Sequence, residues 1–153
     1  MSCSFFYLTF AKRLINSLIY IFIQIILKIG EKVPEFQMLD QNGIQRTNNK
    51  LKSPLVLFFY PKDDTPGCTI EVCGFRDKYD LFKVLGAEVW GVSNGNTASH
   101  LAFANKNKLQ YPLLCDTNDS LRKIFGVPKV LGLLDGRVTY VIDRKGIVRH
   151  IYR

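Results

Sequence analysis

A continuous run of six apolar residues, from Leu55 to Tyr60, constrains the fold of this chain more than any other feature. A strand with one solvated face alternates apolar and polar residues. This run has no polar position, so we expect a strand that is covered on both faces. Pro61 ends the run, and a polar loop then leads to a helical pattern that extends from about Pro66 to Leu85. A buried strand followed by a helix is typical of an α/β protein.

The rest of the chain repeats this alternation of strands and helices. Gln41-Asn42-Gly43 indicates a turn, and Asn96 or Thr97 is a suitable cap for a helix that runs to Leu109. The other expected elements are a strand at Glu88–Ser93, an extended segment at Pro112–Leu114, a short helix at Asp119–Phe125, and two strands at Arg137–Ile142 and Ile147–Tyr152 joined by the hairpin signal Asp143-Arg144-Lys145-Gly146. We therefore predict an α/β fold in which helices flank a mixed central sheet.

Length and charge limit the choice of function. The chain has 153 residues, of which 47% are apolar, and this suits a single globular domain. Its formal net charge is +8, but the Lys and Arg residues are scattered, with no run of five or more. Dispersed positive charge is typical of a solvated surface, so we expect no nucleic-acid partner.

Residues 1–30 differ from everything that follows. An uncharged run from Leu14 to Leu27 follows two basic residues, and its fourteen residues fall short of the roughly twenty that span a bilayer as a helix. No small-residue cleavage site follows it. Five residues of this region recur at helical spacing and share one face of a helix: Arg13, Ser17, Tyr20, Gln24 and Lys28. We expect residues 5–29 to target the chain or attach it to a membrane, as an uncleaved anchor or an interfacial helix. A core helix is the alternative, and residues 31–153 would form the globular domain.

The four cysteines are Cys3, Cys68, Cys73 and Cys115. Their spacing does not suit a framework of structural disulfides, because one lies in the apolar leader and two lie five residues apart in a predicted helix. No CxxC or His-rich pattern indicates zinc, and only two histidines are present. We therefore expect no metal and no cofactor.

Cys68 lies where a polar loop becomes a helix. Thr65 is a preferred N-cap residue, Pro66 suits the first helical position, and Cys68 then falls in the first turn. The unpaired amides and the helix dipole stabilise an anion at this end of a helix. Thiols placed there carry more thiolate, which is the reactive form. A reactive Cys68 is therefore our main interpretation, and a small buried hydrophobe is the alternative.

Cys73 follows Cys68 by five residues. In an ideal helix this separation places the two Cα atoms roughly 8.6 Å apart, whereas a disulfide requires less than about 7 Å. Either the two cysteines never pair, or the first turns must unwind so that Cys73 can reach an oxidised Cys68. The second possibility describes a catalytic cycle with a sulfenic acid and a disulfide. Alternatively, Cys73 is a core residue.

These residues resemble a known family. Pro61-x3-Thr65-x2-Cys68 matches the active-site pattern of the peroxiredoxins. The longer string that resembles the peroxiredoxin Q branch, also called bacterioferritin comigratory protein, is Tyr60-Pro61-Lys62-Asp63-x-Thr65-Pro66-Gly67-Cys68-Thr69-x-Glu71-x-Cys73-x-Phe75-Arg76-Asp77. The match continues through Gly91-Val92-Ser93, Ser99-His100, Tyr111-Pro112-Leu113-Leu114-x-Asp116 and Phe125-Gly126-Val127.

The resemblance implies a thioredoxin-like fold and a thiol peroxidase that reduces hydrogen peroxide and organic hydroperoxides, in antioxidant defence and redox homeostasis. Cys68 would be the peroxidatic residue and Cys73 the resolving one, and thioredoxin or a similar dithiol would reduce the disulfide between them. Thr65 would hydrogen-bond the peroxide, and Pro61 would shield the pocket from water. Arg137 matches the active-site arginine that supports the thiolate.

The resemblance carries further expectations. Glu71 would orient an arginine, and Cys115, which stands where Ser is more usual, would be a buried spare thiol. The family's C-terminal helix follows the last strand, and we expect this chain, which ends at Arg153, to lack it. We expect a monomer in a plastid or thylakoid setting by analogy with plant relatives, or at the cytoplasmic face of a membrane. The alternative function is a membrane-anchored, non-enzymatic redox sensor or scaffold on the same fold. A protein-disulfide oxidoreductase would require a CxxC pair, which this chain lacks.

Overall fold

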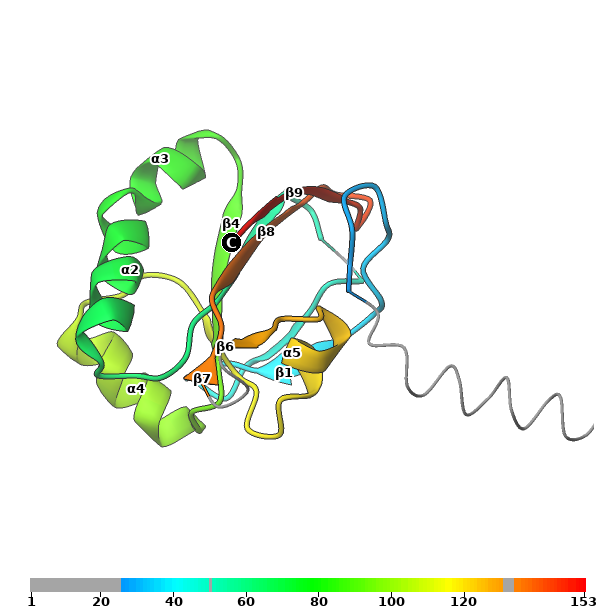
Figure 1. The fold of residues 1–153 in the computed structure, drawn as a ribbon. Helices are drawn as coiled ribbons and strands as arrows, with labels where there is room; N and C mark the ends of the chain where they lie inside the picture. Colours follow the sequence, from blue (N-terminus) through cyan, green and yellow to red (C-terminus); the bar gives the residue numbers. More distant parts are fainter. Residues whose placement is uncertain (1–25, 50, 131–133) are drawn as a thin grey trace, which may run out of the picture.

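A five-stranded sheet forms the centre of the molecule (Figure 1). The structure is a computed structural model, and it describes residues 26–49, 51–130 and 134–153. The strand order is β5-β4-β3-β8-β9. These strands are β3 (Leu55–Phe59), β4 (Glu88–Ser93), β5 (Leu113–Cys115), β8 (Val138–Ile142) and β9 (Val148–Tyr152). Strands β3, β4 and β5 are parallel, while β8 pairs antiparallel with both β3 and β9. The prediction of a mixed α/β sheet is confirmed.

Helices lie on both sides of this sheet. They are α2 (Pro66–Asp77), α3 (Tyr79–Val84), α4 (Thr97–Lys106) and α5 (Ser120–Ile124). Figure 1 shows α2, α3 and α4 on one side of the sheet and α5 on the other. Two small antiparallel pairs complete the described elements: β1 (Gln37–Leu39) with β2 (Gln45–Thr47), and β6 (Lys129–Val130) with β7 (Leu134–Asp135).

Strand β3 is buried on both faces, as its unbroken apolar sequence predicts. Its alternate side chains belong to two separate cores, because successive residues of a strand point to opposite faces. One core joins Val56, Phe58 and Tyr60 to helices α2 and α4 through Cys68, Val72, Phe103 and Ala104. The other joins Leu55, Leu57 and Phe59 to α5 and to strand β8 through Leu121, Phe125, Val138, Tyr140 and Ile142.

The helix expected from Pro66 to Leu85 is divided in two. Lys78 lies between α2 and α3 with φ −103° and ψ 5°, which is outside the helical range, and a new helix begins at Tyr79. Gly86 then ends the helical segment with φ +67°, a conformation that glycine adopts without steric cost. Apolar spacing continues across the break, so the sequence pattern alone does not reveal it.

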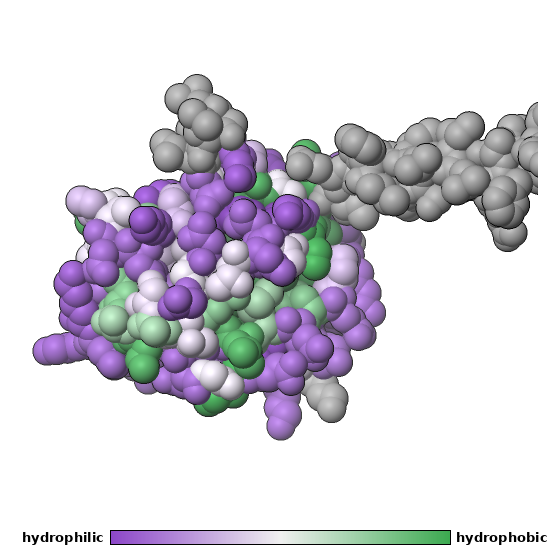
Figure 2. Space-filling model, turned by 90° about the horizontal axis from the view of Figure 1, so that it is seen from below, coloured by the Kyte–Doolittle hydropathy of each residue, from purple (hydrophilic) through white to green (hydrophobic). Residues whose placement is uncertain are grey.

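Most of the predicted membrane segment lies outside the described residues. Leu27 is described, and it is only 2% exposed within the core between α5 and the sheet. Within residues 26–49, 51–130 and 134–153 no helix is long and apolar enough to span a bilayer. Strand β9 is the last described element, and the absence of a further helix stays a prediction. In the view of Figure 2, polar side chains cover most of the surface and apolar ones form patches between them.

Candidate active site

The first turn of α2 presents the thiol of Cys68. Thr65 is the N-cap residue, with an extended backbone (φ −88°, ψ 144°), and Pro66 is the first helical residue. The Thr65 hydroxyl does not cap the helix, since it donates to the Lys62 carbonyl at 3.4 Å instead. In the described part of the chain, the amides of Gly67 and Cys68 have no acceptor. The positive end of α2 therefore faces the buried sulfur of Cys68.

Arg137 lies against this sulfur. Its Nη2 atom is 3.1 Å from Cys68 Sγ, and its Nη1 atom donates to the Glu71 carboxylate. The sheet register brings these residues together, because Phe59 pairs with Val138 and the residues that follow β3 therefore lie beside the residue that precedes β8. Arg137 is 69 residues from Cys68 along the chain, so only the tertiary fold makes this contact.

Gly67 leaves the space that the guanidinium occupies. A Cβ atom at position 67 would lie 3.1 Å from Arg137 Nη2, which is closer than ordinary van der Waals contact. A side chain here would compete with Arg137 for its place beside the thiol. The glycine of the Pro66-Gly67-Cys68 sequence thus has a steric role at the site in addition to its place in the helix.

The pair formed by Arg137 and Glu71 shapes the electrostatics of the site. Burial lowers the pKa of Arg137, but its bonds to Glu71 and Cys68 outweigh burial and raise it. Burial raises the pKa of Glu71, and Arg137 only partly offsets this effect. The guanidinium keeps its proton throughout the physiological range, and its charge favours the ionised form of Glu71 against the effect of burial. Arg137 therefore has two hydrogen-bond acceptors, a carboxylate and the sulfur of Cys68.

Cys73 lies farther along α2 and is not paired with Cys68. Both cysteines are free, and Cys73 Sγ lies 3.7 Å from Asn107 Oδ1. Two more contacts hold this part of the helix: the Tyr111 hydroxyl donates to the Val72 carbonyl at 2.7 Å, and Arg76 Nη1 donates to the Asn107 carbonyl at 2.8 Å. In this conformation α2 is intact and keeps the two thiols apart, as the helix geometry predicts.

A buried carboxylate, not singled out in the sequence as a site residue, anchors the loop before Cys68. Asp63 is 8% exposed and accepts hydrogen bonds from Tyr60 Oη (2.8 Å), Ser99 Oγ (2.6 Å) and His100 Nδ1 (2.7 Å). Burial raises the pKa of Asp63, but these hydrogen bonds outweigh burial and lower it. The loop is also held at Pro61, whose carbonyl accepts from Ser93 Oγ at 3.3 Å.

The remaining predicted residues have simpler surroundings. Cys115 is buried, and burial, followed by the charges of Asp40 and Asp63, raises the pKa of its thiol to about 11. A thiol with so high a pKa carries little thiolate at neutral pH, which agrees with the prediction of a spare cysteine. Across the described residues, no three His, Cys, Asp or Glu side chains cluster so that they could hold a metal ion.

The fold is a mixed sheet between helices, and a thiol lies in the first turn of the helix that follows a buried strand. This combination defines the thioredoxin-like peroxiredoxin class. Residues 29–151 match the AhpC/TSA family. The chain is 50% identical to chloroplastic peroxiredoxin Q of Triticum aestivum and 51% identical to that of Arabidopsis thaliana, in each case over 80% of this chain and 58% of the relative. It thus spans under two thirds of the length of these plant proteins.

Solved structures give the same result. The peroxidoxin BcpB of Mycobacterium tuberculosis matches with a TM-score of 0.75 and 37% identity, over 82% of this chain and 85% of that one. The bacterioferritin comigratory protein of Xanthomonas campestris, studied for its alkyl peroxide reduction activity, matches with a TM-score of 0.75 and 30% identity, over 84% and 86%. The chain belongs to the AhpC/TSA family, in its peroxiredoxin Q and bacterioferritin comigratory protein branch.

Proposed function

We propose that this protein is a thiol peroxidase that reduces hydrogen peroxide and organic hydroperoxides through Cys68. The contact of 3.1 Å between Arg137 Nη2 and Cys68 Sγ carries this proposal, because a guanidinium beside the sulfur stabilises the thiolate. The helix N-terminus adds a second source of positive potential at the same sulfur. This arrangement favours catalysis over a non-enzymatic sensor or scaffold, which would not require an arginine held against the thiol.

In the first step, the Cys68 thiolate attacks one oxygen of the hydroperoxide. An S–O bond forms and the O–O bond breaks, so the sulfur is oxidised to a sulfenic acid while the leaving oxygen takes up a proton and departs as an alcohol or water. Negative charge moves from the sulfur onto the oxygens during this step. Arg137, oriented by Glu71, lies where it can stabilise that charge. Thr65 would hydrogen-bond the peroxide, and Pro61 would shield the pocket from water.

In the second step, the thiol of Cys73 condenses with the sulfenic acid. An S–S bond forms, the S–O bond breaks, and water leaves. Because both residues belong to one continuous helix, part of α2 must unwind before their sulfurs can meet. A dithiol protein of the thioredoxin type would then reduce the disulfide by two exchange reactions.

A plastid location and a monomeric state belong to the same proposal. The plant relatives are chloroplastic proteins, and residues 5–29 would direct or attach the chain there. Fractionation of plastids and size-exclusion chromatography with light scattering test these two points.

The test of function uses the full chain with thioredoxin and its reductase, and follows peroxide consumption. Cys68→Ser is expected to abolish turnover, and Cys73→Ser to allow one stoichiometric oxidation of Cys68 without a cycle. The matched control is Cys115→Ser, which removes a buried thiol away from Arg137 and is expected to leave turnover unchanged. Full activity of Cys68→Ser would refute the assignment.

A further inference from the structure

A second arginine, Arg122, lies near the site and donates to backbone carbonyls next to it, without contacting Cys68 or Arg137. It belongs to the short helix α5, yet it is only 3% exposed. Its guanidinium carbon lies 5.7 Å from the centre of the Phe59 ring. Arginine is seldom buried unless it is paired, and here its nearest carboxylates, those of Asp119 and Asp135, lie 3.8 and 4.0 Å from its Nε atom. The close contacts of this side chain are with backbone carbonyls.

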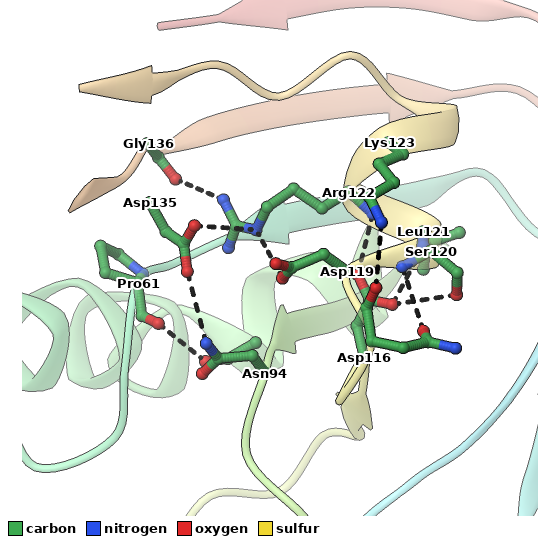
Figure 3. A network of polar contacts seen from close by, with 12 residues as sticks. Pro61, Asn94, Asp116, Asp119, Ser120, Leu121, Arg122, Lys123, Asp135 and Gly136 are labelled. Carbon is green, nitrogen blue, oxygen red and sulfur yellow. Dashed lines mark hydrogen bonds and ion pairs between the residues drawn. The ribbon is translucent and has the colours of Figure 1, made fainter. Parts of the chain in front are cut away.

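Those carbonyls belong to the two segments that carry the site. Arg122 Nη1 donates to the Gly136 carbonyl at 2.9 Å, and Nη2 donates to the Tyr60 carbonyl at 3.0 Å. Gly136 immediately precedes Arg137, and Tyr60 immediately precedes Pro61. Among the described residues no other group donates to either carbonyl. Figure 3 shows the guanidinium of Arg122 reaching from α5 toward Gly136.

The surroundings of Arg122 hold it in this orientation. Its backbone amide donates to Asp116 Oδ2 at 2.8 Å, and the same carboxylate accepts from the amide of Leu121 at 3.0 Å. Asp135, on the Nε side, accepts from Asn94 Nδ2 at 3.4 Å (Figure 3). A planar fork with fixed donors can bridge two carbonyls at once, which a single ammonium group cannot do with the same geometry.

We propose that Arg122 is a positioning residue for the chemistry at Cys68: by bridging the Tyr60 and Gly136 carbonyls, it fixes the loop after β3 against the residue before β8, and so holds Arg137 at the sulfur. The expected effect of Arg122 on turnover rests on the proposed function. The expected effect of Arg122 on the reactivity of the Cys68 thiol rests only on the contact between Arg137 and Cys68. Loss of the bridge frees two buried carbonyls and lets the two segments separate.

The test measures the reactivity of Cys68 in the full chain. The alkylation rate of the peptide that contains Cys68 is followed by mass spectrometry at pH 7 and pH 9.5, and the ratio of the two rates reports the thiolate fraction at pH 7. Arg122→Lys keeps the buried charge but removes the fork, and we expect this ratio to fall about tenfold, with a similar fall in the rate constant for peroxide. Arg149→Lys is the matched control, since Arg149 pairs with Asp143 on the surface and is expected to change neither quantity.

A folded Arg122→Lys protein that keeps both quantities within twofold of wild type would overturn the inference, because a purely structural arginine changes stability without changing the thiol. If Arg122→Lys does not fold, Asp135→Asn serves instead. Asp135 is 13% exposed and supports the Nε side of Arg122 without filling the core. We expect this variant to lower the ratio about threefold, and an unchanged ratio would overturn the inference. If wild type consumes no peroxide, the alkylation ratio still decides the role of Arg122, so the two proposals fail separately.

Discussion

Replacing Tyr111 with Phe is expected to accelerate formation of the disulfide between Cys68 and Cys73. The Tyr111 hydroxyl is buried and donates at 2.7 Å to the carbonyl of Val72, which directly precedes Cys73 in α2. This hydrogen bond exists in the intact helix, and it is lost when the unwinding of α2 reaches Val72. Its removal therefore makes unwinding easier.

The size of the effect follows from this single bond. A buried hydrogen bond of this kind contributes about 1 kcal/mol net. Phe keeps the ring, which packs edge-on against Phe58 with centroids 5.9 Å apart, so little else changes. A shift of about 1 kcal/mol in the unwinding equilibrium corresponds to roughly a fivefold change in the population of the unwound state. We expect the step from sulfenic acid to disulfide to become about five times faster.

The assay counts free thiols over time. Reduced protein is mixed with hydrogen peroxide, quenched in acid, alkylated and weighed by mass spectrometry, and the rate that does not depend on peroxide concentration is taken as the resolving step. Tyr140→Phe is the matched control, because the Tyr140 hydroxyl is also buried and donates to a backbone carbonyl, that of Phe125, at 2.6 Å on the opposite face of the sheet. Both variants should lose about 1 kcal/mol of stability.

Only Tyr111→Phe should accelerate the resolving step. An unchanged rate in Tyr111→Phe, with the expected loss of stability, would show that unwinding does not extend to Val72. Equal acceleration in both variants would show that general loosening of the fold, and not local release of α2, controls the step.

Two further predictions concern the start of α2 and the loop before it. Gly67→Ala should keep or raise the melting temperature, because glycine in a helix costs up to about 1 kcal/mol relative to alanine, yet it should slow alkylation of Cys68 at pH 7 severalfold by displacing Arg137. Gly74→Ala, in the same helix with open space around it, should stabilise without slowing alkylation, and equal thiol reactivity in the two variants would refute the steric role of Gly67. The lowered pKa of Asp63 contributes stability that is present above its unfolded pKa, about 3.9, and is lost as pH falls through the folded value. The free energy of unfolding is measured in urea at pH 7, 5 and 3. Asp63→Asn should be less stable than wild type at pH 7, and its free energy of unfolding should fall less between pH 7 and pH 3. Equal falls in the two proteins would contradict this.

Several elements could be predicted from the sequence because their causes are local. The unbroken apolar run in β3 requires two covering layers, and the structure has both. Asn96 caps α4 by accepting from the Ser99 amide at 2.9 Å, as its residue type predicts. Cys68 falls in the first turn of α2 because Thr65 and Pro66 begin a helix there. These outcomes depend on residues within a few positions of one another.

Other features depend on packing and were missed. The break at Lys78 lies within a continuous helical pattern, and the short pairs β1–β2 and β6–β7 carry little apolar alternation. Asp63 was not predicted as an anchor because its partners, Ser99 and His100, are 36 and 37 residues away. A charged residue in a sequence is expected at the surface by default, and only the fold shows when it is buried and satisfied.

The sequence by itself determined that a thiol would lie in the first turn of a helix after a buried strand, since helix starts and buried strands depend on residues that are close together in the sequence. Only the tertiary structure decided which groups surround that thiol. Arg137 reaches Cys68 because β8 pairs with β3, and Arg122 joins the two segments from a third element. Contacts between residues more than sixty positions apart depend on strand register and core packing, which no local pattern encodes.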